Sequence, residues 1–402
     1  MSKSSLWFLM VVCLLSAAVS GAEGPVIDSM DDLGTFTAPK EKGKIEAVEG
    51  KVGKAIKFSF DKDCSGVFAM GKVRATPEWD NAAGISFWVK GDGSDHLGGL
   101  QFVYNEDYGV RYTCAFPIDS TEWKKIVIPW RDLISVMPKG TLTVDPKSDT
   151  KPSKLGSVWI GKWWFWKDYE ACSFTIDDLR LEPTIELDTK DYKPAGDPLA
   201  RVLAKLKAGK PITIVTMGDS LTDYAHWANK DTNWPTLLKN KLKEKYKSEV
   251  TIVNPAIGGT QLRSNELLMP RWQKQAPEAD LVSVLFGGND FEAGMKGDMF
   301  YDTAKDTIDR IRRTTKGKAD VLMLTTVPSV ANWDAYKELV DAVKKAAPEK
   351  NAGIGDTDAA FHEAGKSNKE ALFASDKTHM SAAGHELICK TFMGALEKAG
   401  KP

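Results

Sequence analysis

The strongest constraint on the fold of this 402-residue chain is a change in hydrophobic period partway along it. From Val26 to about Pro183, short runs of alternating apolar and polar residues are separated by Gly, Asp, Asn and Pro. Beyond about Pro198, apolar runs of strand length alternate with segments of helical period. A period of two indicates an antiparallel β-sandwich, whereas strand and helix in alternation indicate a mainly parallel sheet covered by helices on both faces. We therefore expect two domains of different class.

The boundary between these domains is predicted from a stretch without apolar periodicity. Residues 182–198 are rich in Pro, Asp, Thr and Lys, as expected of an exposed connector. The expected organisation is a β-sandwich over residues 24–185, a linker over 186–198 and an α/β domain over 199–402.

The first 22 residues are of another kind. Lys3 is the only early charge, an apolar run extends from Leu6 to Val19, and small residues precede Glu23. This order is typical of a cleavable secretory signal, and the run is shorter than the roughly 20 residues that a bilayer-spanning helix needs. We expect a secreted or periplasmic protein without integral membrane association. With a formal net charge of -1, the composition does not favour nucleic acid as a partner.

Four cysteines remain once the predicted signal is removed: Cys64, Cys114, Cys172 and Cys389. An even count permits disulfides in an oxidising compartment, and no pair has the spacing of a metal site or a redox motif. Whether one disulfide joins two of the first three stays open. Asp177 and Asp178 also allow two interpretations, a structural calcium site or an ordinary strand end.

Three segments of the predicted sandwich resemble a known module. They are Gly84–Ser94, the strand opened by Trp123 and Lys124, and Phe174–Leu181. They are similar to the galactose-binding-like modules attached to polysaccharide-active enzymes. The resemblance implies a jelly-roll sandwich with a carbohydrate-binding role.

An aromatic cluster lies near the end of the sandwich and comprises Trp159, Trp163, Trp164, Phe165 and Trp166. Flat rings of this kind stack on the apolar faces of sugar rings. The alternative is that alternate rings of one strand fill the core. Trp163, Trp164 and Trp166 are thus candidate substrate-binding residues.

In the second domain, a serine follows the first predicted strand directly. Residues 212–217 form an apolar run that ends in Gly218-Asp219-Ser220. In a parallel sheet ligands gather at the carboxyl ends of the strands, and a following helix would aim its N–H groups at a developing oxyanion. Gly, Asp and Ser are also common turn formers, so this segment needs support from others.

Three further segments supply that support. Asn254 is followed by a loop that contains Gly258 and Gly259, where a backbone N–H has no side chain to obstruct it. The next strand ends ahead of Asn289, whose amide is another donor. Near the C-terminus, Asp376 precedes His379 by three residues, so that one short loop presents a carboxylate and an imidazole together.

These segments, in this order, resemble the SGNH (GDSL-type) hydrolase family over residues 211–399. The resemblance implies a flavodoxin-like three-layer α/β domain that hydrolyses esters without metal or organic cofactor. It implies Ser220 as nucleophile, His379 as base and Asp376 as the group that orients His379. It also implies an oxyanion hole made by the Ser220 N–H, the Gly259 N–H and Asn289. Because the family often has glycine where Ala256 stands, Gly259 is preferred to Gly258 by counting from Asn254.

The substrate is less constrained than the reaction. A sandwich of carbohydrate-binding type beside this hydrolase favours deacetylation of an O-acetylated polysaccharide or oligosaccharide, since the module raises the local substrate concentration. A general short-chain or lipid esterase is the alternative within enzymes, because fold does not fix substrate. A glycan-binding protein with an inactive hydrolase domain is the alternative outside them. His226 and Trp227 are candidates for the substrate pocket, against an ordinary loop role.

Overall fold

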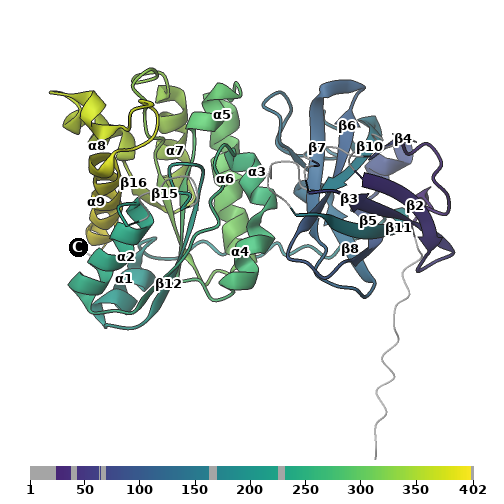
Figure 1. The fold of residues 1–402 in the computed structure, drawn as a ribbon, viewed down its shortest axis with the longest axis horizontal. Coiled ribbons are helices and arrows are strands. Elements are labelled where there is room, and N and C mark those ends of the chain that lie inside the picture. The colour runs from purple at the N-terminus through teal and green to yellow at the C-terminus, as the bar shows by residue number, and fades with distance from the viewer. Residues whose placement is uncertain are drawn as a thin grey trace, which may run out of the picture.

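A computed structural model describes residues 24–37, 43–62, 64, 69–162, 170–224 and 231–399. Several sequence-based predictions fall outside these residues: the signal peptide over residues 1–22, and the binding candidates Trp163, Trp164, Trp166, His226 and Trp227. The two predicted fold classes are confirmed, and Figure 1 shows the β-sandwich beside the α/β half of the chain.

The N-terminal half is built from two sheets whose strand pairs are all antiparallel. One sheet has the order β2 (Gly43–Glu49), β3 (Lys54–Phe60), β11 (Cys172–Glu182), β5 (Gly84–Gly91) and β8 (Lys124–Pro129), with β1 (Val26–Asp28) beside β11. The other has the order β4 (Ala69–Arg74), β10 (Leu155–Lys162), β6 (Leu97–Tyr104), β7 (Asp107–Pro117) and β9 (Ile134–Ser135). Short 3-10 turns lie at η1 (Pro77–Asn81), η2 (Trp130–Asp132) and η3 (Pro152–Lys154).

Aromatic residues fill the space between the two sheets. Phe116 of β7 contacts Phe87 of β5 and Phe174 of β11 edge-on, with ring centroids 5.2 and 5.3 Å apart. Trp159 is not part of this core. It is half-buried on the opposite side of β10 from the core residues Val158 and Ile160, with Arg111 5.2 Å from its ring centroid. Of the aromatic cluster, the one ring described in β10 therefore lies on the outer face of its sheet.

The carboxylates considered for calcium have protein partners in the structure. Asp177 accepts the N–H groups of Lys51 and Val52 at 2.6 and 2.8 Å, and Asp178 pairs with Arg180 at 2.6 Å. Within the described ranges, no group of three or more acidic, His or Cys side chains is arranged to hold a metal ion.

The cysteines of the sandwich are not joined to one another. Cys114 and Cys172 are buried free thiols, and burial raises the pKa of each to about 12. Any disulfide among Cys64, Cys114 and Cys172 needs one of these two, so the structure contains none of the three pairings left open by the sequence.

The C-terminal half has a parallel sheet in the order β13 (Val250–Val253), β12 (Ile212–Gly218), β14 (Leu281–Leu285), β15 (Asp320–Leu324) and β16 (Gly353–Gly355). Numbered along this half, the order is 2-1-3-4-5, the flavodoxin-like order. One face is covered by α1 (Ala200–Lys207), α2 (Trp234–Tyr246), α8 (Thr357–Ala364) and α9 (Ala382–Lys398). The other is covered by α3 (Leu262–Leu267), α4 (Met269–Gln275), α6 (Gly297–Thr314) and α7 (Lys337–Glu349). The short segments α5 (Gly288–Glu292) and η4 (Lys369–Leu372) complete it.

The two halves meet where α3 and α6 lie against the sandwich (Figure 1). The buried guanidinium of Arg263 donates to the carbonyls of Ser135, Met137 and Gly140 at 3.2, 3.2 and 3.4 Å. Arg310 of α6 pairs with Asp132 of the sandwich at 2.7 Å. Charged groups thus hold the contact at defined points. Among the described residues, no helix has the length and apolar character needed to cross a bilayer.

Candidate active site

Ser220 lies at the carboxyl end of β12, in a turn that the local sequence enforces. A Cβ atom on Gly218 would lie 2.2 Å from the Thr222 hydroxyl, so only glycine fits there. The Asp219 side chain accepts the Leu221 N–H at 3.0 Å, and its carbonyl accepts the N–H groups of Thr222 and Asp223 at 3.0 Å each. These bonds fix the turn that presents the Ser220 hydroxyl at the sheet edge.

The structure brings Ser220, His379 and Asp376 together. His379 Nε2 is 2.9 Å from Ser220 Oγ, and His379 Nδ1 is 2.8 Å from Asp376 Oδ2. The loop that carries the last two is fixed at its end, where Ser381 caps α9 by accepting the Gly384 N–H at 3.3 Å. One continuous chain of polar contacts therefore joins the serine to the carboxylate.

Asp376 is held in its ionised form. Partial burial alone raises the pKa of this carboxyl, but the N–H groups of His379 and Thr378, at 2.9 and 3.0 Å, and the His379 ring outweigh burial and lower it to about 2. A carboxylate ionised at neutral pH accepts a proton-bearing Nδ1, which leaves Nε2 as the atom that faces the serine.

Two glycines of the loop after β13 differ in what their N–H groups contact. The Gly258 N–H donates to Asp223 at 3.0 Å. For Gly259, at φ +78°, no hydrogen bond from the N–H to a described residue is found, and the residue is exposed. Asn289 lies at the start of α5, and its amide donates to the Thr260 carbonyl at 3.1 Å and to Asp219 at 3.3 Å. The Asn289 amide is thereby oriented beside the Ser220 turn.

Two buried carboxyl groups, Asp219 and Asp290, lie behind these donors. Burial raises the pKa of each to about 7. Asp290 Oδ1 accepts the Leu262 N–H at 3.0 Å, which joins α5 to α3, and Oδ2 has no hydrogen-bond partner within the described part of the chain. Asp219 thus supports its own turn, whereas Asp290 supports the contact between α5 and α3.

A cavity of about 360 Å³ opens beside Ser220. Its polar lining includes Asn289, Glu292, Asn332, Tyr336 and Thr378. Sequence reasoning missed Glu292, Asn332 and Tyr336, because none belongs to a recognised motif. One available signal was that the segment after β15 lies at the same sheet edge as Ser220, since β14 and β15 are parallel neighbours.

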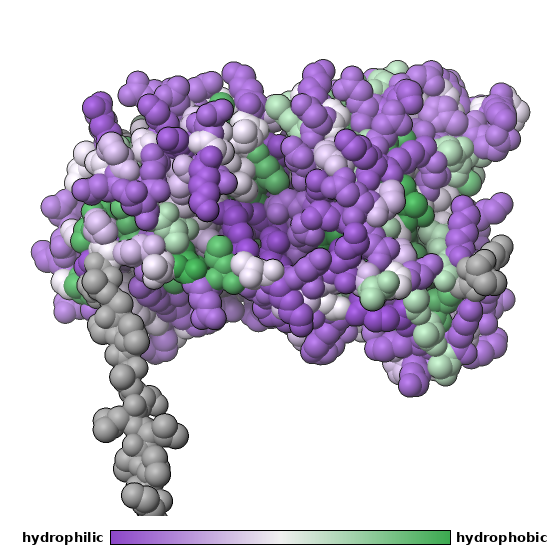
Figure 2. All heavy atoms as spheres, turned by 180° about the vertical axis from the view of Figure 1, so that it is seen from behind, coloured by the Kyte–Doolittle hydropathy of each residue, from purple (hydrophilic) through white to green (hydrophobic). Residues whose placement is uncertain are grey.

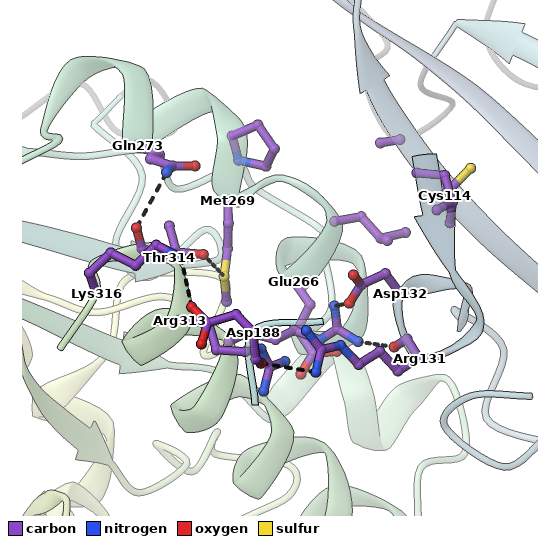
Figure 3. Close-up of a pocket in the computed structure, with 15 residues that line it drawn as sticks. Cys114, Arg131, Asp132, Asp188, Glu266, Met269, Gln273, Arg313, Thr314 and Lys316 are labelled. Carbon is purple, nitrogen blue, oxygen red and sulfur yellow. Dashed lines mark hydrogen bonds and ion pairs between the residues drawn. The ribbon is translucent and has the colours of Figure 1, made fainter. Parts of the chain in front are cut away.

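A second cavity, of about 350 Å³, lies between the two halves and is lined by charged residues of both (Figure 3). Arg131 and Asp132 come from the sandwich, and Glu266 and Arg313 come from α3 and α6. Seen from behind, the surface at this contact is hollowed and largely hydrophilic (Figure 2). Ser220, His379 and Asp376 do not line this cavity, so the two cavities are separate.

Comparison with known families assigns both halves. Residues 216–387 match the GDSL-like Lipase/Acylhydrolase family, and residues 23–146 match the carbohydrate binding domain of family 11. The chain therefore carries a GDSL-like hydrolase domain behind a carbohydrate-binding module, and it is a carboxylic ester hydrolase.

Individual relatives each match less than half of the chain. An acetylxylan esterase from Geobacillus stearothermophilus is 26% identical over 47% of this chain and 95% of its own length. A mannan endo-1,4-beta-mannosidase from Bifidobacterium adolescentis is 24% identical over 43% of this chain but only 18% of its own. Similar solved structures include the G. stearothermophilus acetylxylan esterase, 24% identical over 49% of this chain and 97% of that chain with a TM-score of 0.40. A putative GDSL-like lipase from Parabacteroides merdae is 18% identical over 47% and 96%, with a TM-score of 0.41.

Proposed function

We propose that this protein is an exported serine esterase that removes acetyl groups from an O-acetylated polysaccharide or oligosaccharide. The observation that carries the proposal is the contact chain from Ser220 Oγ through His379 to Asp376, at 2.9 and 2.8 Å, in an ester hydrolase that also has a carbohydrate-binding module. Export rests on the apolar run within residues 1–22, which is typical of a secretory signal.

The proposed reaction proceeds in two halves. His379 Nε2 takes the Ser220 proton as Oγ attacks the ester carbonyl, and the same proton passes to the departing sugar hydroxyl when the tetrahedral intermediate collapses. A water molecule then gives its proton to His379 and attacks the acetyl-enzyme, which releases acetate and restores Ser220. Asp376 stabilises the imidazolium in both halves through Nδ1–H.

The proposed oxyanion hole consists of the Ser220 N–H, the Gly259 N–H and the Asn289 amide. Gly259 is favoured over Gly258 because the Gly258 N–H already donates to Asp223. The Asn289 amide donates to the Thr260 carbonyl and to Asp219, which orient it beside Ser220, and the longer bond, to Asp219 at 3.3 Å, is the one that it would exchange for the oxyanion.

The acetylated carbohydrate is favoured over other esters by two independent facts. The hydrolase half is similar to an acetylxylan esterase along nearly the full length of that enzyme, 95%. The other half matches a carbohydrate binding domain, which would hold a polysaccharide beside the enzyme at raised local concentration.

The test is acetate release from a panel of acetylated polysaccharides and oligosaccharides by the purified protein and by Ser220→Ala, with nitrophenyl acetate as a second substrate. We expect release from at least one carbohydrate and its loss in Ser220→Ala. Activity confined to nitrophenyl esters would replace the proposal by a general short-chain or lipid esterase. Undiminished activity in pure Ser220→Ala protein would contradict the assignment of the nucleophile.

A further inference from the structure

We propose that Glu292, Asn332 and Tyr336 form a subsite for the hydroxyl groups of the sugar unit that carries the ester, and that this unit is an uncharged sugar. The inference rests on the proposed function, which supplies the ester and its sugar. It adds the residues that recognise the sugar and the charge class that they accept.

The subsite lies next to the reacting atoms. The cavity lined by these three residues is also lined by Ser220, by Asn289 and by Thr378, which directly precedes His379. It therefore extends from the proposed oxyanion donor to the neighbourhood of the imidazole. The group that His379 protonates is the departing sugar hydroxyl, so the sugar ring must lie within reach of this space.

The three side chains form one connected polar wall. Asn332 Nδ2 donates to Glu292 Oε1 at 2.8 Å and to the Tyr336 hydroxyl at 3.3 Å. Because these bonds use the amide nitrogen of Asn332, its Oδ1 remains available to a ligand. The second oxygen of Glu292 and the Tyr336 O–H remain available as well. The wall thus combines two acceptors with a donor, as neighbouring sugar hydroxyls require.

The wall is positioned before any ligand binds. Tyr336 is 5% exposed, and its ring packs edge-on against Phe291, with ring centroids 5.0 Å apart. The Asn332 N–H donates to the Ser329 hydroxyl at 3.0 Å, which fixes the loop that carries the amide. A preorganised wall loses little conformational entropy on binding.

The charge of the lining selects against anionic sugars. Glu292 and the buried Asp219 are acidic, and the lining residues that the structure describes include no lysine, arginine or histidine. A uronate at this position would bring a carboxylate toward Glu292 without a compensating cation. Val327, Pro328 and Ala331 supply the apolar surface on which the ring of a neutral sugar packs.

The experiment compares Tyr336→Phe, Asn332→Ala and Glu292→Gln with the parent protein. Glu244→Gln, on the exposed side of α2, is the matched control for loss of a carboxylate. For each protein, kcat and KM are measured on an acetylated neutral oligosaccharide, on an acetylated oligouronate and on nitrophenyl acetate. Nitrophenyl butyrate reports on the acyl side of the site.

We expect the ratio of kcat/KM on the neutral sugar ester to kcat/KM on nitrophenyl acetate to fall about tenfold in Tyr336→Phe and Asn332→Ala, chiefly through KM, as the loss of one hydrogen bond predicts. We expect Glu292→Gln to lower the preference for the neutral sugar over the uronate by about tenfold, and Glu244→Gln to change neither quantity. Equal losses on all substrates would indicate a structural role and overturn the inference. An altered preference between nitrophenyl acetate and butyrate would overturn it in favour of an acyl pocket.

The two proposals fail in different ways. If the parent protein releases acetate from sugars but all three variants keep the parent ratios within about twofold, only the subsite is wrong. If the parent protein cleaves nitrophenyl acetate and no sugar ester at all, the proposed function is wrong and the subsite falls with it.

Discussion

Carboxyl groups in two regions of this molecule are stabilised differently. At the carboxyl edge of the parallel sheet, Asp219 and Asp290 are 3% and 0% exposed and are held by N–H donors. At the contact between the two halves, Asp132 is paired with an arginine, Arg310, at 2.7 Å. The comparison teaches that the second region uses charge to join surfaces, whereas the first uses uncharged donors to shape the surroundings of Ser220. Substitutions of side chains that contact Ser220 or His379 should affect rate, whereas those at the contact between the halves, or of a buried carboxyl such as Asp290, should affect stability.

Asp376→Asn tests the first region most severely. An amide carries no charge to stabilise the imidazolium, and its N–H group can donate to Nδ1 and so hold the wrong tautomer of His379; we therefore expect kcat on nitrophenyl acetate to fall on the order of 10⁴-fold. The thermal unfolding midpoint should change little, since Asp376 is partly exposed. Kinetics and a thermal melt on the same preparation check this, and a loss of less than tenfold would exclude Asp376 as the orienting group.

Asn289→Ala removes one proposed oxyanion donor. We expect kcat to fall about 10²- to 10³-fold with little change in KM, because the amide acts on charge that develops after binding. The matched control is Asn265→Ala, whose side chain donates to Thr260 at 2.9 Å and lies outside the cavity beside Ser220. A larger loss in the control than in Asn289→Ala would count against the assignment.

Arg310→Met tests the second region. It leaves Asp132 without its close cation and Asp306 with Arg313 alone, at 3.7 Å. Because these carboxylates are 34% and 22% exposed, we expect the cost to lie below the roughly 3–5 kcal/mol of breaking a fully buried ion pair. We expect a lower unfolding midpoint together with kcat on nitrophenyl acetate within about threefold of the parent value. Calorimetry and kinetics measure both, and Lys318→Met, at an exposed ion pair with Glu278, serves as the control with an expected cost of at most about 1 kcal/mol. If Arg310→Met lost activity but kept the unfolding midpoint of the parent, the contact between the halves would serve catalysis and not stability, contrary to the comparison.

Asp290→Asn tests the first region through the dependence of stability on pH. Burial raises the pKa of Asp290 from 3.8 to about 7, so the native protein retains a proton that the unfolded chain loses as pH rises. This group therefore lowers stability progressively between about pH 4 and pH 7. The neutral amide removes that penalty, so we expect the unfolding midpoint of the variant to exceed that of the parent at pH 8 by at least ~2 °C and to match it near pH 4. A variant with the parent's pH profile would contradict the prediction.

Sequence reasoning reached the parts of this molecule that are encoded locally. The turn at Ser220 and the Asp376-to-His379 spacing are each written in a few consecutive residues, so their chemistry is visible before folding. The period change predicted both fold classes for the same reason, since each strand or helix carries its own pattern.

Features that depend on contacts between distant segments were not predicted. Glu292 and Asn332 are 40 positions apart and meet because β14 and β15 end at one edge. Arg263 shows no sign in the sequence that it reaches carbonyls more than 120 positions away. Such pairings follow from strand order and docking, which no single segment specifies.

The hydrogen bonds of Arg263 to three carbonyls of the sandwich have a consequence for the proposed action on a polysaccharide. If a flexible linker joined the module to the hydrolase domain, the active site could reach many ester groups around the point where the module binds the polysaccharide. Here the buried guanidinium of Arg263 holds the sandwich in one orientation relative to the hydrolase half, which carries Ser220. Under the proposed function, we therefore expect cleavage at a set offset from the point of attachment, with fewer positions reached from each attachment than a flexible linker would allow.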